Sequence, residues 1–530
     1  MQTIQLSLSP EQAADDNAIR TEIAKTLSVD TNDISSFRIV RKSIDARGRR
    51  PVVILQLNVF VGEQPDRYAY FNTFDYHDVT NAKEVIVVGS GPAGLFAALR
   101  LIELGLRPII VERGKTVEHR TVDVDRIYRN EELDEESNIC FGEGGAGTFS
   151  DGKLFSRSKK SGKTGRILEI FHRHGAQDEI LYDAHPHIGT DVLQSVVANI
   201  RKTILQCGGE MLFSAKVIDI LLQGDRVTGV RLADNRTLNS DYVVLATGHS
   251  ARDIYRILTE KRIAVEAKGF AMGVRVEHPQ ELIDKIQYKG YKNDFLPAAS
   301  YNLTAQFSDR GVYSFCMCPG GMIVPSATER RGVVVNGMSN SQRNSPFANS
   351  GIVVQLHPKD LSDFHQHGEL CGLYFQQHLE HLAYVNNGGQ NQKAPAQRLD
   401  DFVKGKLSGE ISQSSYLPGT VSSPMHFWLP SPIGEALREG FKIFDRKMRG
   451  FVTSQAVALG VESRTSSPVR IPRHRDTLQH TQIAGLYPCG EGAGYSGGIT
   501  SSAIDGERVA EQIKLDTINN RDAHTRKHFT

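Results

Sequence analysis

Three glycines and one acid carry the clearest chemistry in this sequence. Gly89, Gly91 and Gly94 follow an apolar run at residues 85–88 and have the spacing of a turn that binds phosphate. Gly91 has no side chain to block a pyrophosphate, and the helix that begins there offers unpaired N–H groups to negative charge. Glu112 follows Gly89 by 23 positions, close to the offset of about 20 at which an acid binds an adenosine ribose. The segment therefore predicts a dinucleotide-binding βαβ unit.

A strand, a helix and a second strand must position these residues. Residues 85–88 are β-branched and suit a strand buried on both faces. Pro92 fits the first turn of the helix because it has no N–H to lose, and Gly105 fits the end of the helix. Residues 108–111 form the second strand. Glycine clusters at 142–147 and 490–494 match the same spacing but open no βαβ unit with a ribose acid, so we expect one dinucleotide fold.

The bulk composition limits the classes of function. A chain of 530 residues exceeds one compact core, so two or three domains are expected. The 62 Lys and Arg against 61 Asp and Glu give a net charge of +1, which provides no general field for binding nucleic acid or acidic lipid. The N-terminal residues do not resemble a signal peptide, and the longest apolar stretch is interrupted by glycine and proline. We therefore expect a cytoplasmic protein without membrane or nucleic-acid partners, whose six scattered cysteines are thiols.

The chain divides into four expected segments. Residues 1–80 are predicted to form an N-terminal α+β domain, 81–262 and 471–530 the two parts of the nucleotide-binding domain, and 263–470 an inserted substrate or cap domain. The basic run at 41–50 is interpreted as a solvated hairpin or a docking surface, because residues 1–80 carry nine Lys and Arg against eleven Asp and Glu. Helices are expected at 10–27, 117–136 and 499–515, an exposed loop at 386–393 and a frayed end at 519–530.

Longer motifs resemble a bacterial family of FAD-dependent dehydrogenases without an assigned substrate, within the glutathione-reductase-like superfamily of FAD- and NAD(P)-binding proteins. They are GEGGAGTFSDGKL (142–154), HPHIGTDVL (185–193), FCMCPGG (315–321), VESRTSSPVRIPR (461–473) and YPCGEGAGYSGGI (487–499). The superfamily's general marks are also present in order, including a hydrophobic strand that closes in ATG at 246–248. The resemblance implies FAD as cofactor and an α/β fold, with a Rossmann-like FAD-binding domain, an inserted α+β substrate or cap domain and a small N-terminal α+β domain.

The resemblance also assigns residues to the parts of FAD. It implies a pyrophosphate site at Gly89, Gly91, Pro92, Ala93 and Gly94, an adenosine site near Glu112, Arg113 and Val217, contacts from Thr247 and Gly248, and a ribityl contact from Glu491 beside Gly490, where the superfamily usually has aspartate. Independently of the resemblance, Gly497, Gly498 and Ile499 precede a helix, so its N–H groups are expected to face the N1 and O2 edge of the flavin. The loop at 142–152 contains five glycines, which predicts that Gly144, Gly145 and Thr148 lie against FAD.

The catalytic residues stay unknown at this level. Lys153, His249 and Cys489 are candidates; the alternative role of His249 is packing or capping, and that of Cys489 is a small buried apolar residue. Cys316 and Cys318 are expected to be buried free thiols that point to opposite faces of a strand. Arg464 is expected either to clamp a substrate carboxylate or to join an ion pair. The histidines have no ligand pattern for zinc or iron, so no metal is predicted; those considered were His185, His187, His278, His378 and His381.

These observations favour an FAD-dependent oxidoreductase. We expect it to transfer a hydride between an unidentified small molecule and flavin N5, and either NAD(P)H docks transiently or the substrate itself reduces the flavin. Two alternatives remain open, a flavin-dependent RNA-modifying enzyme and a non-catalytic FAD-binding redox sensor.

Overall fold

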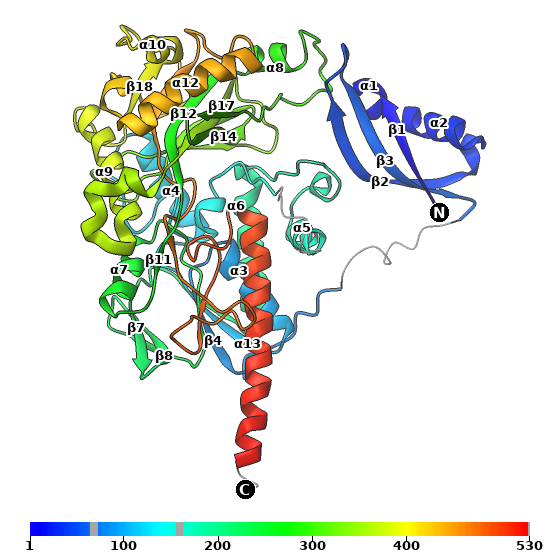
Figure 1. Ribbon diagram of the computed structural model, residues 1–530. Coiled ribbons are helices and arrows are strands. Elements are labelled where there is room, and N and C mark those ends of the chain that lie inside the picture. The colour runs from blue at the N-terminus through cyan, green and yellow to red at the C-terminus, as the bar shows by residue number, and fades with distance from the viewer. Residues whose placement is uncertain (64–72, 155–162, 528–530) are drawn as a thin grey trace.

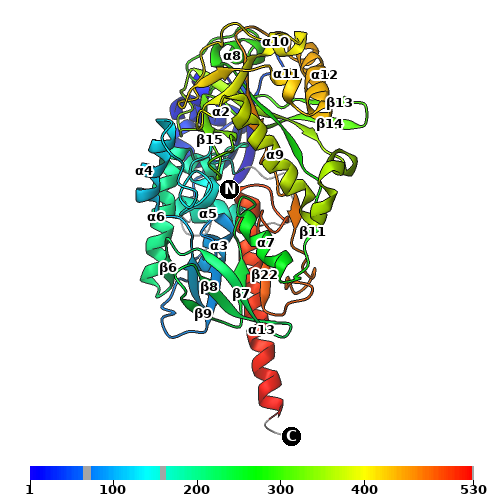
Figure 2. The same ribbon diagram turned by 90° about the vertical axis from the view of Figure 1, so that its left-hand side faces the viewer.

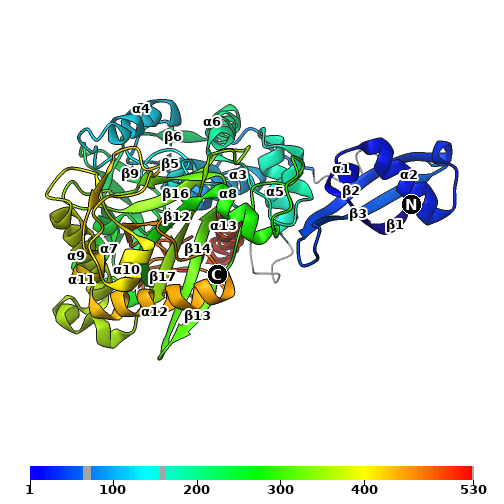
Figure 3. The ribbon, with the colours of Figure 1, turned by 90° about the horizontal axis from the view of Figure 1, so that it is seen from above.

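The computed structural model describes residues 1–63, 73–154 and 163–527. Figure 1 shows three units, and the N-terminal one stands to the side of the other two. Of the two larger units, the lower one contains the parallel sheet and the long helix α13 (Ile499–Lys527), and the upper one contains a long antiparallel sheet. Seen from above, the N-terminal unit projects from the main body (Figure 3).

The N-terminal unit is a small antiparallel sheet covered by helices. Its strands lie in the order β1 (Gln2–Leu8), β3 (Val52–Val61) and β2 (Ile34–Asp45). Between β1 and β2 the chain forms α1 (Pro10–Ala13), α2 (Asp16–Leu27) and a 3-10 turn (Thr31–Asp33). The single helix expected at 10–27 is divided in two, because the Asp15 side chain accepts a hydrogen bond from Asn17 N–H and caps a new start.

The basic hairpin between β2 and β3 contacts the main body. Lys289 Nζ, from the main body, donates to the Gly48 carbonyl at 2.9 Å, whereas the Arg47–Asp45 ion pair at 2.6 Å lies within the hairpin. The backbones of Lys42 and Asp183 pair in an isolated parallel β-bridge. The hairpin therefore docks on the main body through these contacts while residues 47–50 at its tip stay exposed, so each interpretation describes part of it.

A five-stranded parallel sheet forms the centre of the lower unit. Its order is β22 (Leu486–Pro488), β10 (Val243–Leu245), β4 (Glu84–Val88), β5 (Arg107–Val111) and β6 (Glu210–Leu212). The predicted strand-helix-strand unit is confirmed as β4, α3 (Pro92–Glu103) and β5. Around it lie α4 (Val117–Tyr128), a 3-10 turn (Gly145–Gly147), α5 (Thr164–Arg173), a second 3-10 turn (Asp178–Leu181), α6 (Thr190–Gln206), the antiparallel strands β7 (Val217–Gln223), β8 (Arg226–Leu232) and β9 (Thr237–Asn239), and α7 (Arg252–Glu260).

The chain returns to this sheet after a long insertion. β22 pairs in parallel with β10, and α13 packs against α3. A Cβ on Gly506 of α13 would lie 2.1 Å from the Ala93 carbonyl oxygen, so the missing side chain allows the two helices to approach closely. Figure 1 shows α13 descending past α3.

The upper unit is built on a seven-stranded sheet. Its order is β13 (Thr304–Phe307), β14 (Arg310–Cys318), β17 (Phe347–Gln355), β12 (Ala271–Pro279), β20 (Val457–Glu462), β18 (Ala394–Arg398) and β19 (Thr420–Ser422). The hairpin β15 (Gly321–Pro325) and β16 (Val335–Ser339) and the pair β11 (Glu266–Ala267) and β21 (Val469–Arg470) accompany it. Its helices are α8 (Gln280–Gln287), a 3-10 segment (Pro358–Leu370), α9 (Cys371–Asn386), α10 (Leu399–Lys404), α11 (Met425–Trp428) and α12 (Ser431–Lys447). Figure 2 shows α9 running beside the sheet.

Three local expectations are corrected. α4 ends at Tyr128 rather than near 136. The loop at 386–393 is exposed at its tip, but Asn387 and Gln392 are buried. The Gln392 side chain points into the protein, where it donates to the Gly332 carbonyl at 3.1 Å. α13 continues to Lys527, through the stretch expected to be frayed, because no glycine or proline interrupts it after Gly506. Across the described ranges, each helix is too short or too polar to span a bilayer.

Candidate functional site

The first glycine turn separates two reasons for having glycine. A Cβ on Gly89, whose φ is +103°, would lie 2.5 Å from the Ala246 carbonyl oxygen, and one on Gly94 would lie 1.9 Å from the Gly89 carbonyl oxygen. Protein packing therefore requires both glycines. Gly91 caps α3 with an ordinary φ of −72°, and a Cβ there would meet only the Gly145 Cα, at 3.8 Å. The protein thus leaves room at Gly91, which fits the position where a ligand approaches the helix N-terminus.

Glu112, at the end of β5, lies directly behind this turn. Its buried carboxylate accepts hydrogen bonds from Ser90 N–H at 2.9 Å, from Gly114 N–H at 2.9 Å and from Gly142 N–H at 3.0 Å. The Ser90 hydroxyl donates to it at 2.8 Å. In this arrangement the predicted ribose acid holds the turn and the second glycine loop together. The adjacent Arg113 lies over the Phe141 ring, at 4.1 Å from its centroid.

A buried arginine positions the glycine loop at 142–147. The Arg120 guanidinium, contributed by α4, is fully buried and donates to four main-chain carbonyls, those of Asn138, Ile139 and Glu143 at 2.7 Å and Gly145 at 2.9 Å. Burial lowers the pKa of Arg120 to about 10. Gly144 N–H donates to the Ser90 carbonyl at 2.9 Å, which brings this loop against the first turn. Sequence reasoning missed Arg120 because its partners lie on a loop without regular structure.

The third part of the site joins the ATG turn to the late glycine-acid segment. A Cβ on Gly492 would lie 2.4 Å from the Gly248 carbonyl oxygen, so the two segments touch. His249 Nδ1 lies 3.4 Å from Glu491 Oε1, whereas His249 Nε2 is buried without a hydrogen-bond partner among the described residues. An orphaned buried polar atom next to glycines suits a site whose remaining partner is a ligand. Thr247 adjoins the first turn, since a Gly89 Cβ would lie 3.2 Å from its Cα.

The N-terminus of α13 completes the glycine-lined surface. A Cβ placed on Gly248, Gly497 or Gly498 would meet nothing within 4 Å. Ile499 opens the helix, and its side chain lies 3.4 Å from where a Gly147 Cβ would stand. These open glycines line a cradle that side chains would fill, and the residues present therefore fit an extended dinucleotide. Thr500 Oγ1 donates to the Leu154 carbonyl at 2.8 Å, so α13 begins beside Lys153.

Lys153 brings together two cysteines of the upper unit. Its Nζ lies 3.8 Å from Cys316 Sγ, 3.5 Å from Cys318 Sγ and 3.3 Å from Asp151 Oδ2. The expectation that the two thiols point apart is wrong. Side chains two positions apart share one face of a strand, and the β14–β17 register shifts between Phe315 and Cys318, where Cys316 has a φ of +48°.

The charges around this cluster are mutually dependent. Burial would lower the pKa of the Lys153 ammonium, but Asp151 and the two cysteines raise it above its usual value. Burial would raise the pKa of Asp151, but Lys153 and Arg343 hold it well below the usual range. A hydrogen bond between the thiols holds the pKa of Cys316 well below its usual value, aided by Lys153, and raises that of Cys318. The pair thus favours one thiolate and one thiol.

Arg464 does clamp a carboxylate, but the carboxylate belongs to the protein. It contacts both oxygens of Glu380, with Nε–Oε1 at 3.1 Å and Nη2–Oε2 at 3.0 Å, and Arg252 reaches the same acid at 2.8 Å. Burial would raise the pKa of Glu380, but the two arginines lower it to about 2. Of the two interpretations of Arg464, the ion pair is the one the structure shows. It ties α9 to α7 and to the segment after β20.

Cys489 and Val217 face the protein core. Cys489 is fully buried, and burial raises the pKa of its thiol well above the usual value, which disfavours a reactive thiolate. Val217 is buried at the start of β7, close to β5, because Ala215 N–H donates to the Glu112 carbonyl at 2.9 Å.

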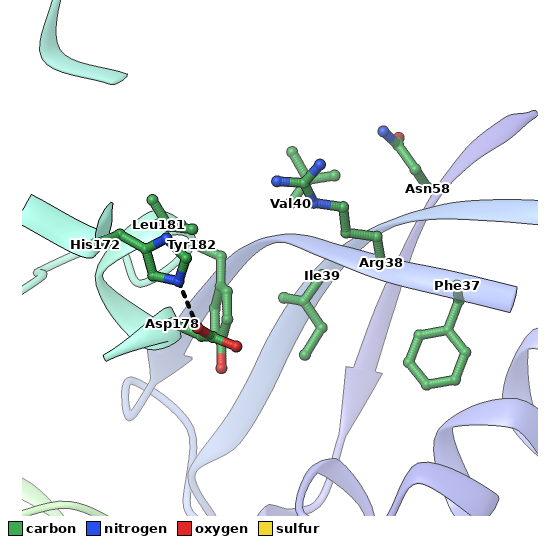
Figure 4. Close-up of a pocket in the computed structure, with 9 residues that line it drawn as sticks. All are labelled: Phe37, Arg38, Ile39, Val40, Asn58, His172, Asp178, Leu181 and Tyr182. Atoms are coloured by element: carbon green, nitrogen blue, oxygen red, sulfur yellow. Dashed lines mark hydrogen bonds and ion pairs between the residues drawn. The ribbon is translucent and has the colours of Figure 1, made fainter. Parts of the chain in front are cut away.

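A cavity of about 530 Å³ lies elsewhere, between the N-terminal unit and the segment around the second 3-10 turn. Figure 4 shows β2 residues on one side and His172, Asp178, Leu181 and Tyr182 on the other, with His172 bonded to Asp178. None of the glycines described above lines it. We therefore do not place the cofactor there.

Three family models match the chain in succession. Residues 1–60 match a domain of unknown function, 83–267 match "Pyridine nucleotide-disulphide oxidoreductase", and 269–465 match "FAD-dependent protein, C-terminal domain-like". An uncharacterized protein from Clostridium beijerinckii is 40% identical over 516 residues, which cover 94% of this chain and 96% of that protein. A thiamine thiazole synthase from Aeropyrum pernix is 27% identical over 215 residues, covering 38% of this chain and 66% of that protein.

Similar solved structures include CtdE in complex with FAD, at 12% identity and a TM-score of 0.32 over 82% of this chain and 85% of that chain. The flavin-dependent brominase Bmp2 is 13% identical, with a TM-score of 0.36 over 82% of this chain and 79% of that chain.

The parallel sheet, its glycine turns and the two larger family matches define an FAD-dependent oxidoreductase. The chain belongs to a bacterial family of FAD-dependent proteins without an assigned substrate, together with the Clostridium beijerinckii protein. The predicted fold class and the predicted cofactor are thereby confirmed.

Proposed function

We propose that the protein transfers a hydride between a small-molecule substrate and N5 of FAD, at the junction of the FAD-binding and cap units. The observation that carries this proposal is the meeting of Lys153 with Cys316 and Cys318 next to the start of α13. Polar groups from both units converge there, beside the cradle of open glycines. A substrate at this junction would contact both units.

The residues around the cradle bind successive parts of the cofactor in this proposal. Gly91, Pro92 and Ala93 present the N-terminus of α3 to the pyrophosphate, as Gly144, Gly145 and Thr148 do from the second loop, while Glu491 and His249 face the ribityl chain. FAD supplies reversible two-electron chemistry when bound. Gly497 and Gly498 leave the N-terminus of α13 uncovered, and its N–H groups stabilise negative charge on the ring that they face.

Lys153 belongs to the FAD-binding unit, and its positive charge faces the cap at this junction. Since Asp151 keeps the pKa of Lys153 above its usual value, the ammonium persists across the physiological pH range. It orients an anionic or carbonyl group of the substrate and donates a hydrogen bond to it. Lys153 is one third exposed, so such a group has access to it.

The number of dinucleotide folds supports two possible sources of electrons in this proposal. The described residues contain one parallel sheet with one glycine turn of the dinucleotide type. NAD(P)H therefore docks transiently, or the substrate itself reduces the flavin.

Anaerobic titration of the purified flavoprotein tests this function. The flavin absorbance is followed on addition of NADH, NADPH and a panel of hydride donors, and at least one is expected to bleach it with saturation. A flavin that no donor bleaches, and that acceptors do not reoxidise once a photoreductant has reduced it, would instead indicate a non-catalytic redox sensor.

A further inference from the structure

The two thiols that mark the junction have no chemical step assigned to them in the hydride transfer proposed above. We propose that Cys316 and Cys318 form a dithiol–disulfide redox pair that exchanges two electrons with the bound FAD. This inference rests on FAD binding but not on the hydride-transfer substrate.

The backbone geometry suits closure of a bond between the two sulfurs. Residues two apart on a regular strand are separated by about 6.6 Å, near the upper limit of about 6.8 Å for a disulfide. The bulge at Cys316, with its φ of +48°, takes the backbone out of this regular extended path. Both sulfurs lie within 3.8 Å of the same Lys153 nitrogen, so they already face one point.

Cations surround the pair. Lys153 stands on one side, and on the other Arg275 Nη2 lies 3.6 Å from Cys318 Sγ and donates to the Cys316 carbonyl at 2.6 Å. Arg275 is fully buried and held by Glu462 at 2.8 Å. Positive charge at this distance favours a thiolate, which is the form that attacks a disulfide or an electron-poor ring. The other nearby charged groups are Asp151 and Arg343.

Access differs between the two sulfurs. Cys316 is half-buried whereas Cys318 is fully buried, as expected if an external partner meets the first thiol and the second resolves the bond. On the other side the pair adjoins the cofactor site, because Lys153 precedes Leu154, whose carbonyl accepts the Thr500 hydroxyl at the start of α13.

The step balances without another reagent. From one thiolate and one thiol, the pair loses two electrons and one proton as the Sγ–Sγ bond forms, and bound oxidised FAD would take up both electrons and that proton. The reverse step reduces the disulfide. Lys153 remains protonated and stabilises the thiolate that precedes bond formation.

Mass analysis of the holoprotein tests the pair directly. The protein is poised in glutathione buffers from reduced to oxidised, quenched in acid and alkylated, and the tryptic peptide 311–330, which contains both cysteines, is examined. We expect a single transition from a doubly alkylated peptide to one that carries no alkyl group and has lost two hydrogen atoms. A peptide that is doubly alkylated in every buffer, or that only acquires glutathione, overturns the proposal.

Anaerobic reduction by dithiothreitol tests the link to FAD. Wild-type flavin is expected to bleach, and Cys316→Ser and Cys318→Ser are expected to lose this bleaching while illumination with a photoreductant still bleaches them. Cys207→Ser, which alters a half-buried thiol at the end of α6, is the matched control and should behave as wild type. Bleaching of both serine variants at the wild-type rate overturns the link. If they fail to fold, the wild-type peptide measurement still decides whether the pair forms, and a flavin that dithiothreitol leaves unbleached in the wild type overturns the link without touching hydride transfer.

Discussion

Replacement of Gly91 by alanine separates cofactor binding from folding. The new Cβ would stand 3.8 Å from the Gly145 Cα, an ordinary contact, at a φ of −72° that alanine adopts readily. The apoprotein should therefore fold as before. In the holoprotein the methyl group occupies the place proposed for the pyrophosphate, so we expect FAD binding to be lost.

The expected loss follows from the hydrogen bonds at the start of α3. If two bonds from main-chain N–H groups to a phosphate are broken, at about 1.5–3 kcal/mol each, the binding free energy falls by about 3–6 kcal/mol. The Kd for FAD then rises about 100- to 20,000-fold. Fluorescence titration of the apoprotein with FAD measures this change, and thermal unfolding of the apoprotein measures stability.

Two other glycines serve as controls. Gly165→Ala in α5 places a Cβ where nothing lies within 4 Å, so both FAD binding and stability should be kept. Gly506→Ala places a Cβ 2.1 Å from the Ala93 carbonyl oxygen and should lower the Tm of the apoprotein. The reasoning is refuted if Gly91→Ala binds FAD as tightly as wild type, or if it lowers the apoprotein Tm as Gly506→Ala does.

Three further substitutions test the supporting contacts. Arg120→Lys cannot reach four carbonyls with one ammonium, so we expect a loss of about 3 kcal/mol in the free energy of unfolding and weaker FAD binding; unchanged denaturant curves would argue against this role. Glu380→Gln leaves buried Arg464 without its carboxylate partner and Arg252 with Glu329 alone, and should cost about 3–5 kcal/mol at neutral pH. Because the pKa of Glu380 is about 2 in the folded protein, against about 4.3 when unfolded, its contribution is complete above pH 4.3 and disappears as the pH falls toward 2; a difference between wild type and variant that stays constant over this range contradicts the assignment. Lys153→Met removes a cation beside Cys316, so the pH midpoint of Cys316 alkylation should rise, and an unmoved midpoint would show that Lys153 does not stabilise the thiolate.

The nucleotide-binding unit could be predicted because its rules are local. The β-branched run of β4, the glycines of the turn and the apolar helix α3 lie within about one βαβ unit of sequence, and each residue's type follows from its own backbone position or burial. The parallel pairing of β4 with β5 needs no information from the rest of the chain.

The contacts that hold the site together could not be predicted in this way. Glu380 and Arg464 are 84 positions apart, and Arg252 and Glu380 are 128 apart, so nothing in either local pattern identifies the partner. The meeting of Cys316 and Cys318 on one side of β14 depends on a bulge at Cys316, which no glycine marks in the sequence. Arg120 resembles any helix arginine until the loop that it holds is in place.

The close packing of α13 on α3 has a consequence for biosynthesis. As the ribosome releases the chain, β4, α3 and β5 have emerged by residue 111, whereas β22 begins only at residue 486, with the whole cap between them. The early half must wait with one face of α3 and one edge of its sheet uncovered until those late elements arrive. Coenzyme capture then becomes a signature of finished synthesis, and nascent chains halted before residue 486 should emerge colourless and dependent on chaperones.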